Sequence, residues 1–368
     1  MLKSVGKDDA VQLILKLSGN ECNIDCVYCY EKQREYSGIK YLSANILEKS
    51  LSSFNGRTIY VQLHGGEPLL MSKQEMKEII ETIRKFDGEY HINIQTNATL
   101  LSAEWLDFFE EFCPELELGI SIDGDADCNS FRVDYNNNPT FNLVDKALRL
   151  CEERGKNVGI ISVVNRNSLN KEENILDYFS RFTCIKMINF MSCIHFDDSK
   201  LEEDINHWAT TSFEYVEFIK RIFNVWKRKE YYKNFFIDPI FSIIRKLHGK
   251  TAIFCHYNDS KCNNIFTLFP DGSLKSCDEL NLSDSIHSPD MNLKDRFMLN
   301  KMNQLLNVCK KCDYYEVCSG GCLGIRSRYE NIQDRQQYCL AKSYLIDFIA
   351  ESINVKPIKS LIPEEDYE

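Results

Sequence analysis

Six apolar segments of strand length occur in the first 200 residues, and a helical pattern separates each from the next. The strand segments are VQLILKLSG from Val11, TIYVQLHGG (58–66), YHINIQTN (90–97), LELGISIDG (116–124), KNVGIISVVN (156–165) and CIKMINFMS (184–192). The helical patterns lie near residues 43–54, 72–86, 102–113, 140–154 and 172–181. Strands that alternate with helices form a parallel sheet that the helices cover. The pattern therefore predicts an α/β fold, a partial (β/α)6 TIM-like barrel whose ligand loops follow the strand ends.

Three cysteines in the loop after the first strand segment, Cys22, Cys26 and Cys29, have the spacing Cys-x3-Cys-x2-Cys. A structural zinc ion takes four protein ligands. The next cysteine is Cys113, however, and the nearest histidine, His64, belongs to a different predicted loop. An iron-sulfur cluster held by three cysteines leaves one iron without a protein ligand. The spacing favours chemistry at such an open iron, with a zinc site or three unrelated reduced cysteines as the alternatives.

The composition limits the partners of this chain. With 368 residues, 43% of them hydrophobic, it can bury a large α/β core and a smaller second unit. A formal net charge of -11 argues against a nucleic-acid partner, although a basic groove for an acidic peptide stays open. Residues 1–10 lack the apolar core of a signal peptide, and no segment of about twenty apolar residues can span a membrane. We expect a cytoplasmic protein whose 16 cysteines bind metal more readily than they form disulfides.

The pattern changes after residue 200. The segment LEEDINHWATTSFEYVEFIKRIFNVWKRK (201–229) predicts a long helix that ends in a basic turn. A hairpin is predicted at NIFTLFPDGSLKSC, where Pro270, Asp271 and Gly272 supply the turn, and a final amphipathic helix is predicted after Cys339. We expect a barrel over residues 1–200, a helical bridge over 201–250, a cysteine-rich domain over 251–345, and a helix end and tail over 346–368.

The cysteine triplet, with the aromatic Tyr28 before its last member, resembles the signature of the radical S-adenosylmethionine (radical SAM) superfamily. In that family the open iron of a 4Fe-4S cluster binds S-adenosylmethionine (SAM), and the reduced cluster cleaves SAM to methionine and a 5'-deoxyadenosyl radical. The resemblance implies that Cys22, Cys26 and Cys29 hold this cluster and that Tyr28 is a cofactor-binding residue. It also implies an electron donor such as flavodoxin or ferredoxin.

The sequence HGGEP at residues 64–68 resembles the GGEP motif of the same family, which holds the SAM amino group. Two glycines after a strand let the backbone approach a ligand closely, and a glutamate accepts hydrogen bonds from an ammonium group. The resemblance implies that Gly65, Gly66 and Glu67 bind SAM, and a plain strand-ending turn is the alternative.

Three further cofactor contacts follow from alignment to the family pattern. Ser121, in the loop after the fourth strand segment, and Arg132 beyond it resemble the residues that take the SAM ribose and carboxylate. Ile188, on the sixth strand segment, would lie against the adenine. For Ile188 a plain core role is the alternative, because isoleucine is among the most often buried residues.

Eight further cysteines form a framework near the C-terminus, and its spacing resembles that of the SPASM domain. The resemblance implies two auxiliary 4Fe-4S clusters. Cys255, Cys262, Cys277 and Cys322 would hold the first, and Cys309, Cys312, Cys318 and Cys339 the second. Two zinc ions are the alternative, because CxxC pairs suit either metal. We expect the other cysteines to be buried free thiols, namely Cys113, Cys128, Cys151, Cys184 and Cys193.

Asp278 directly follows one of these cysteines, in KSCDEL. The chain resembles the anaerobic sulfatase-maturating enzymes in length and in its motif positions, and in those enzymes an aspartate at this place deprotonates the substrate. The resemblance implies that Asp278 is the proton acceptor, and a solvated acid at the hairpin end is the alternative. The chain departs from those enzymes after the third cysteine, where their aromatic pair is here Tyr30 followed by Glu31.

The sequence therefore predicts a radical SAM/SPASM enzyme that acts on a peptide or protein side chain with three 4Fe-4S clusters and SAM. We favour a maturase that cross-links a ribosomally made precursor peptide through thioether or carbon-carbon bonds. The enzymatic alternative is formylglycine formation in a sulfatase. The non-enzymatic alternative is an iron-sulfur or zinc-binding scaffold. Only 21 residues precede Cys22, so we expect no separate leader-binding domain there.

Overall fold

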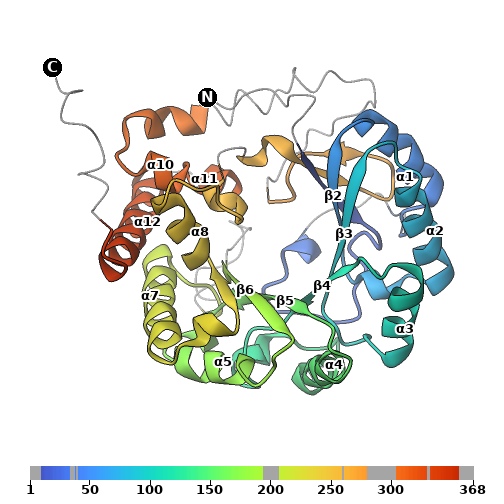
Figure 1. Cartoon of the computed structure of the whole chain (residues 1–368), viewed down its shortest axis with the longest axis horizontal. Coiled ribbons are helices and arrows are strands. Elements are labelled where there is room, and N and C mark those ends of the chain that lie inside the picture. The colour runs from blue at the N-terminus through green and yellow to red at the C-terminus, as the bar shows by residue number, and fades with distance from the viewer. Residues whose placement is uncertain are drawn as a thin grey trace.

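The computed structural model describes residues 10–33, 38, 40–193, 207–258, 261–279, 304–329 and 332–355. Within these ranges a nine-stranded sheet has the order β7-β6-β5-β4-β3-β2-β1-β8-β9. The six predicted strands are β1 (Val11–Lys16), β2 (Thr58–His64), β3 (Glu89–Thr96), β4 (Glu117–Ser121), β5 (Val158–Val164) and β6 (Ile185–Ser192). Each pairs in parallel with the next, so the predicted partial barrel is confirmed (Figure 1).

Five helices lie on the outside of these strands (Figure 1). They are α1 (Ala44–Leu51), α2 (Lys73–Arg84), α3 (Ala103–Phe112), α4 (Phe141–Glu153) and α5 (Glu172–Phe179). Ser43, Ser72 and Ser102 accept backbone hydrogen bonds at the first three helix starts, which satisfies donors that a helix leaves unpaired. The alternate residues of the strands that face these helices form the main hydrophobic core.

Three short strands extend the sheet beyond the six that the sequence predicts. They are β7 (Phe236–Asp238), β8 (Ile265–Leu268) and β9 (Leu274–Lys275). The predicted hairpin is confirmed, because β8 and β9 pair antiparallel. The hairpin also joins the barrel sheet, since β8 pairs in parallel with β1, with Gln12 beside Ile265. The C-terminal cysteine-rich region is thereby attached edge to edge to the strand that leads into the cysteine triplet.

The segment predicted as a bridge packs directly on the barrel. The long helix α7 (Ser212–Arg228) begins after Thr211, whose side chain forms a capping box with Glu214, and it ends in the predicted basic turn. The Tyr215 hydroxyl donates to the Phe190 carbonyl of β6 at 2.7 Å. Residues 201–206 of the predicted helix lie outside the described residues.

Two more helices complete this side of the molecule, α8 (Ile240–Leu247) and α12 (Ile332–Ser352). α12 packs against α7, where the rings of Phe223 and Phe348 lie 5.7 Å apart. The final helix was predicted to follow Cys339, but this cysteine lies within α12, which begins seven residues earlier. Among the described helices, none is long and apolar enough to cross a membrane.

Candidate functional site

The cysteine triplet lies in the loop between β1 and α1, and its three thiols are within electrostatic reach of one another. Burial raises the pKa of the Cys26 thiol to about 12, and the neighbouring Cys29 and Cys22 raise it further, while Arg132 opposes this shift. Burial also raises the pKa of Cys22 and of Cys29. The Asn97 side-chain amide donates to the Cys22 sulfur at 3.6 Å. Three thiols that disfavour one another's ionisation suit a shared metal centre that binds them as thiolates.

A buried polar network holds Tyr28 and Arg132 beside this loop. The Tyr28 hydroxyl donates to Asp123 and accepts from Arg132 Nη1 at 3.2 Å. Asp123 also accepts from the Val163 amide at 3.0 Å and from the Asn165 side chain at 3.2 Å. Burial raises the pKa of Asp123, and Arg132 opposes that shift. Arg132 Nε has no hydrogen-bond partner among the described residues, which leaves one donor of a buried cation unused.

The HGGEP segment fixes the cysteine loop. A Cβ atom at Gly66 would lie 1.8 Å from the Glu21 carbonyl oxygen, and Gly66 has a φ of +45°. The Glu67 amide donates to the same oxygen at 2.8 Å, and Ser18 Oγ donates to the Gly65 carbonyl at 2.6 Å. The sequence predicts glycines that let a ligand approach. In the structure, the group that approaches Gly66 is the backbone that leads into Cys22.

The Glu67 carboxylate is buried below this contact. It accepts hydrogen bonds from the Thr96 hydroxyl at 2.6 Å, the Asn97 amide at 2.7 Å and the Leu69 amide at 2.9 Å. Burial raises the pKa of Glu67, and these three hydrogen bonds oppose the shift. The sequence-predicted carboxylate is therefore held rigidly by β3 and by the turn after β2.

Ser121 and Ile188 lie on opposite faces of the sheet. Ser121 at the end of β4 accepts a hydrogen bond from the Gln95 side chain at 2.7 Å. Its in-register neighbours are Ile161 on β5 and Asn189 on β6. Because side chains alternate along a strand, Ile188 points to the other face, where it is fully buried in the main core. This is the core position that the sequence left as the alternative for Ile188.

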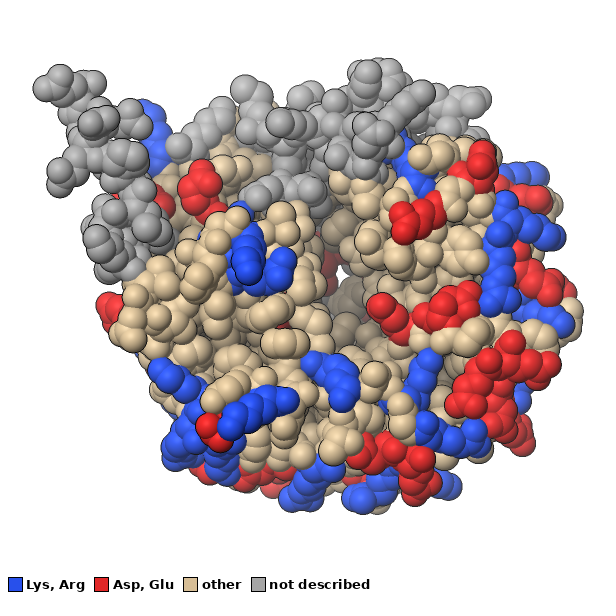
Figure 2. Space-filling view, viewed as in Figure 1, with Lys and Arg blue, Asp and Glu red and all other residues tan. Residues whose placement is uncertain are grey.

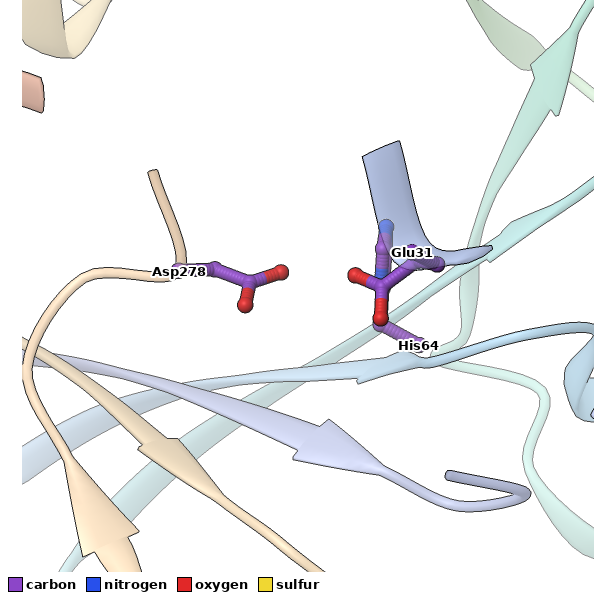
Figure 3. A group of neighbouring side chains, drawn as sticks. All are labelled: Glu31, His64 and Asp278. Atoms are coloured by element: carbon purple, nitrogen blue, oxygen red, sulfur yellow. The ribbon is translucent and has the colours of Figure 1, made fainter. Parts of the chain in front are cut away.

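A buried lysine joins the acidic residues near Asp278. Lys16, the last residue of β1, forms ion pairs with Glu31 and Asp278, and its Nζ lies 3.3 Å from His64 Nδ1. The Tyr30 hydroxyl donates to Asp278 at 2.9 Å. Figure 3 shows the Asp278 side chain pointing toward Glu31 and His64. Asp278 is 8% exposed, so the alternative of a solvated hairpin acid is wrong.

Glu31, His64 and Asp278 offer ligand atoms within 4.8 Å of one another, the geometry of a metal site. The Lys16 ammonium already bonds both carboxylates, however. A second cation there would face the charge of a lysine that is itself fully buried. We interpret the group as a counterion cluster, and refer to Lys16, Glu31, His64 and Asp278 as the Lys16 cluster.

The cysteines predicted to hold the first auxiliary cluster come together below β8. The pKa of Cys277 is raised by its hydrogen bond with Cys262 and by burial, and burial raises the pKa of Cys322 to about 12, with Glu279 and Cys277 adding to the rise. Cys255 packs against the buried group that contains Cys262 and Cys277. The same buried group also contains Cys309 of the second predicted set, so the division of these cysteines between two clusters stays a prediction.

The second predicted set also comes together. Cys309 lies in a short 3-10 helix (Val308–Lys311) and Cys312 directly follows it, Cys318 ends α10 (Tyr315–Cys318), and Cys339 lies on α12. Burial raises the pKa of Cys312, and Cys318 and Cys309 add to the rise. The pKa of Cys339 is raised by burial and by the same neighbours. The five ungrouped cysteines are buried free thiols, as predicted.

A family model described as the radical SAM superfamily matches residues 17–179. Residues 17–179 form a radical SAM domain. A cysteine-type anaerobic sulfatase-maturating enzyme of Clostridium perfringens is 25% identical over 360 residues, which cover 89% of this chain and 93% of that enzyme. A serine-type anaerobic sulfatase-maturating enzyme of Bacteroides thetaiotaomicron is 26% identical over 346 residues, covering 84% and 82%.

A solved structure has the same fold as this radical SAM chain. Native anSMEcpe with bound AdoMet and a Cp18Cys peptide aligns with a TM-score of 0.76 at 22% identity, over 96% of this chain and 100% of that chain. Because the likeness covers the cysteine-rich region as well as the barrel, the C-terminal part shares the fold too. The radical SAM domain and the two relatives that are enzymes favour an enzyme over the metal-binding scaffold.

Sequence reasoning about the radical SAM site missed three residues that the structure brings into it. In the sequence, Lys16 is only a polar residue at the end of a mostly apolar strand. Its buried partner Asp278 is 262 positions away, so the pair is visible only in the folded chain. Asp123 lies in the segment after β4, close to the predicted SAM contact Ser121, but the sequence alone suggested no role for Asp123. Met191 pairs in register with Val163, and Val163, like Cys26, packs against the buried group that contains Tyr28. Alternation along β6 was the signal for Met191, because it places this residue on the Ser121 face.

Proposed function

We propose that this radical SAM enzyme oxidatively modifies side chains of a ribosomally made precursor peptide, forming thioether or carbon-carbon cross-links. The reaction takes place in the reducing cytoplasm, with a flavodoxin or ferredoxin as electron donor. The observation that carries the proposal is the buried Asp278, which lies one residue beyond Cys277 and is paired with Lys16. Such a carboxylate is placed to take a proton next to a group of thiols that suits an electron-accepting cluster.

The triplet Cys22, Cys26 and Cys29 holds the catalytic 4Fe-4S cluster in this proposal. Three thiols in one buried loop fit the group, because each is a strong iron ligand once deprotonated and Arg132 offsets part of their negative charge. When bound, the cluster supplies the electron that cleaves SAM. The other two cysteine sets hold the auxiliary clusters, each with four thiol donors.

SAM would be held by residues that still have unused hydrogen-bond donors or acceptors of the kind that its groups require. An ionised carboxylate offers about four acceptor sites, and Glu67 uses three of them, so one remains for the SAM amino group. Arg132 Nε is the donor for the SAM carboxylate, and the Ser121 hydroxyl takes the ribose. Tyr28, Gly65 and Gly66 shape the surrounding wall. We place the apolar contact to adenine at Met191, on the Ser121 face, in place of Ile188.

Asp278 is the proposed proton acceptor. After a hydrogen atom has left the peptide, the substrate must still lose one proton and one electron to become a closed-shell product. The Asp278 carboxylate receives the proton, and the buried Lys16 ammonium keeps that carboxylate ionised and oriented beforehand. The Tyr30 hydroxyl fixes the same carboxylate from a second direction. The electron would leave through the cluster held by the cysteine set that includes Cys277, the residue before Asp278.

The charge of the Lys16 cluster bears on the substrate. Two carboxylates face one ammonium, so the cluster is net negative when His64 is neutral. A cavity of this charge disfavours acidic substrate side chains and accepts neutral or cationic ones. Figure 2 shows a hollow at the centre of the face viewed in Figure 1, with acidic and basic side chains around it. Glu31 replaces the second aromatic residue of the sulfatase-maturating pair, which supports a different peptide substrate.

The proposal is tested with the full chain, reconstituted anaerobically and given SAM, dithionite and a synthetic copy of a short peptide encoded beside its gene. We expect 5'-deoxyadenosine, together with a peptide that has lost two hydrogen atoms for each cross-link and no other atom. Fragmentation in the mass spectrometer locates the link, because a cross-linked segment does not break into its usual fragments. SAM cleavage with an unaltered peptide would count against the cross-linking activity.

Formylglycine formation is the second candidate, favoured by the relatives that cover most of this chain. In the same assay with a CxPxR-type sulfatase peptide, this activity would remove the cysteine sulfur and leave an aldehyde that a hydrazine reagent captures. Running both peptides side by side separates the two functions. An aldehyde on the sulfatase peptide and no change in the precursor peptide would replace the first proposal by the second.

A further inference from the structure

A buried arginine contacts one of the two C-terminal cysteine sets. Arg326, on α11 (Leu323–Arg328), is 2% exposed. Its Nη1 atom donates to the Cys309 sulfur at 3.2 Å and to the Gly320 carbonyl at 2.9 Å, and Nη2 donates to the Leu305 carbonyl at 2.6 Å. The guanidinium is therefore clamped in one orientation, with one donor directed at a predicted cluster ligand.

The surroundings of Arg326 indicate that the sulfur centre is its counterion. Its guanidinium donates to two backbone carbonyls and a sulfur, and Nε has no hydrogen-bond partner among the described residues. Burying a cation without an anion costs several kcal/mol. An ionised thiolate group supplies the missing negative charge.

Gly320 lies directly against this contact. A Cβ atom there would lie 3.4 Å from Arg326 Nη1 and 3.6 Å from the Cys309 sulfur, which are ordinary van der Waals distances. It would lie only 2.4 Å from a Leu306 methyl group, and Gly320 has a φ of +83°. A larger residue at this position would therefore disturb Leu306 and the backbone whose carbonyl accepts from Arg326.

The other cysteine set has a different electrostatic environment. Arg328, two positions along α11, donates from Nη2 to Glu279 Oε2 at 3.0 Å, so a carboxylate neutralises it. Glu279 lies two residues beyond Cys277, a member of the first set. One set thus has a directly bonded cation, and the other has a carboxylate and a neutralised arginine. The two sets adjoin, because Cys277 and Cys309 belong to one buried cluster.

We propose that Arg326 is a positioning residue that raises the reduction potential of the cluster held by Cys309, Cys312, Cys318 and Cys339 above that of the other auxiliary cluster. Hydrogen bonds and positive charge at cluster sulfurs stabilise the reduced, more negative state. The inference rests on the proposed function, which supplies the two clusters.

The potential difference gives electron transfer a direction. One electron passes from the reduced first auxiliary cluster, which is oxidised by one electron, to the second, which is reduced by one, and no proton or bond moves. A one-electron carrier protein then takes the electron away. Cys312 and Cys339 are exposed, whereas Cys262, Cys277 and Cys322 are buried. The second set is thus the one that such a carrier can approach.

The test is a potentiometric titration of the reconstituted full chain, followed by electron paramagnetic resonance. We expect two auxiliary couples of different potential in the unaltered protein. Arg326→Gln should lower the higher of the two reduction potentials by at least roughly 59 mV, which corresponds to about a tenfold change in the equilibrium constant of a one-electron reduction. The reason is that a hydrogen bond to a charged group contributes about 1.5–3 kcal/mol. Arg326→Lys keeps the charge and should shift that couple less.

Arg328→Gln is the matched control on the same helix, and it should leave the higher couple in place. Unchanged potentials in an Arg326→Gln protein that retains full iron content would overturn the inference. So would equal potentials of the two auxiliary couples in the unaltered protein, a result that does not depend on how any variant folds. An unaltered protein that binds only one cluster would instead refute the proposed cofactor set itself.

Discussion

Gly66 is the position where the structure makes its sharpest prediction about the catalytic loop. A Cβ atom at Gly66 would lie 1.8 Å from the Glu21 carbonyl oxygen, whereas real contacts of this kind are essentially never shorter than 3.0 Å. In Gly66→Ala the two loops must therefore separate by about 1 Å. Because Glu21 directly precedes Cys22, the triplet moves with it, and a misplacement of about 1 Å at a reacting centre costs roughly 100-fold in rate.

Gly56→Ala is the matched control. Gly56 also has a positive φ, of +76°, but nothing lies within 4 Å of its Cβ position. Both alanines carry the cost of a left-handed backbone, about 1–2 kcal/mol, and only Gly66→Ala adds the collision. The assay measures 5'-deoxyadenosine with dithionite, together with iron content. We expect a loss of about 100-fold for Gly66→Ala and little change for Gly56→Ala. Equal rates for the two variants would refute the account of this loop.

Three further predictions concern the Lys16 cluster and the auxiliary cysteines. Lys16→Met should lower the free energy of unfolding, measured with urea, by about 3–5 kcal/mol, because it removes the ammonium group that pairs with the buried carboxylates of Glu31 and Asp278. Lys40→Met breaks the exposed pair with Glu21 and should cost about 1 kcal/mol or less, so equal losses would contradict the burial argument. Asp278→Asn should leave SAM cleavage intact and lower modified peptide by about 100-fold, the usual scale for loss of a general base. Glu279→Gln should do much less, and undiminished product from Asp278→Asn would end the proton-acceptor assignment. The Cys312→Ala protein should contain about a third less iron and unfold at a lower temperature. Full iron content would mean that Cys312 does not hold the second auxiliary cluster.

The long strands could be predicted from sequence because their patterns are local. β1 to β6 each carry an apolar run of strand length, and a helical pattern separates each run from the next. β7, β8 and β9 have only two to four residues, and such short runs carry no periodicity. The pairing of β8 with β1 joins segments about 250 residues apart, so only the folded chain reveals it.

The site could be predicted as far as cysteine spacing determines it. The three thiols of the triplet lie near one another because their spacing is a local property of the chain. The division of the other eight cysteines between two clusters stays a prediction from the resemblance, because Cys277 and Cys309 lie in one buried group. The Lys16 cluster was missed because it depends on tertiary packing, which buries Lys16, Glu31 and Asp278 against one another. The register of β6 separates Ile188 from the Ser121 face, and alignment to a family pattern does not determine register.

The most direct test of the central claim is to compare the unaltered protein with a variant in which Cys22, Cys26 and Cys29 are all changed to alanine. We predict about twelve iron atoms in the reconstituted protein, four for each cluster, and about a third fewer in the triple variant. The unaltered protein should form 5'-deoxyadenosine from SAM with dithionite, and the triple variant should form none. If the triple variant still cleaved SAM, the catalytic cluster would not be held by this loop, and the account of the site built around it would be wrong.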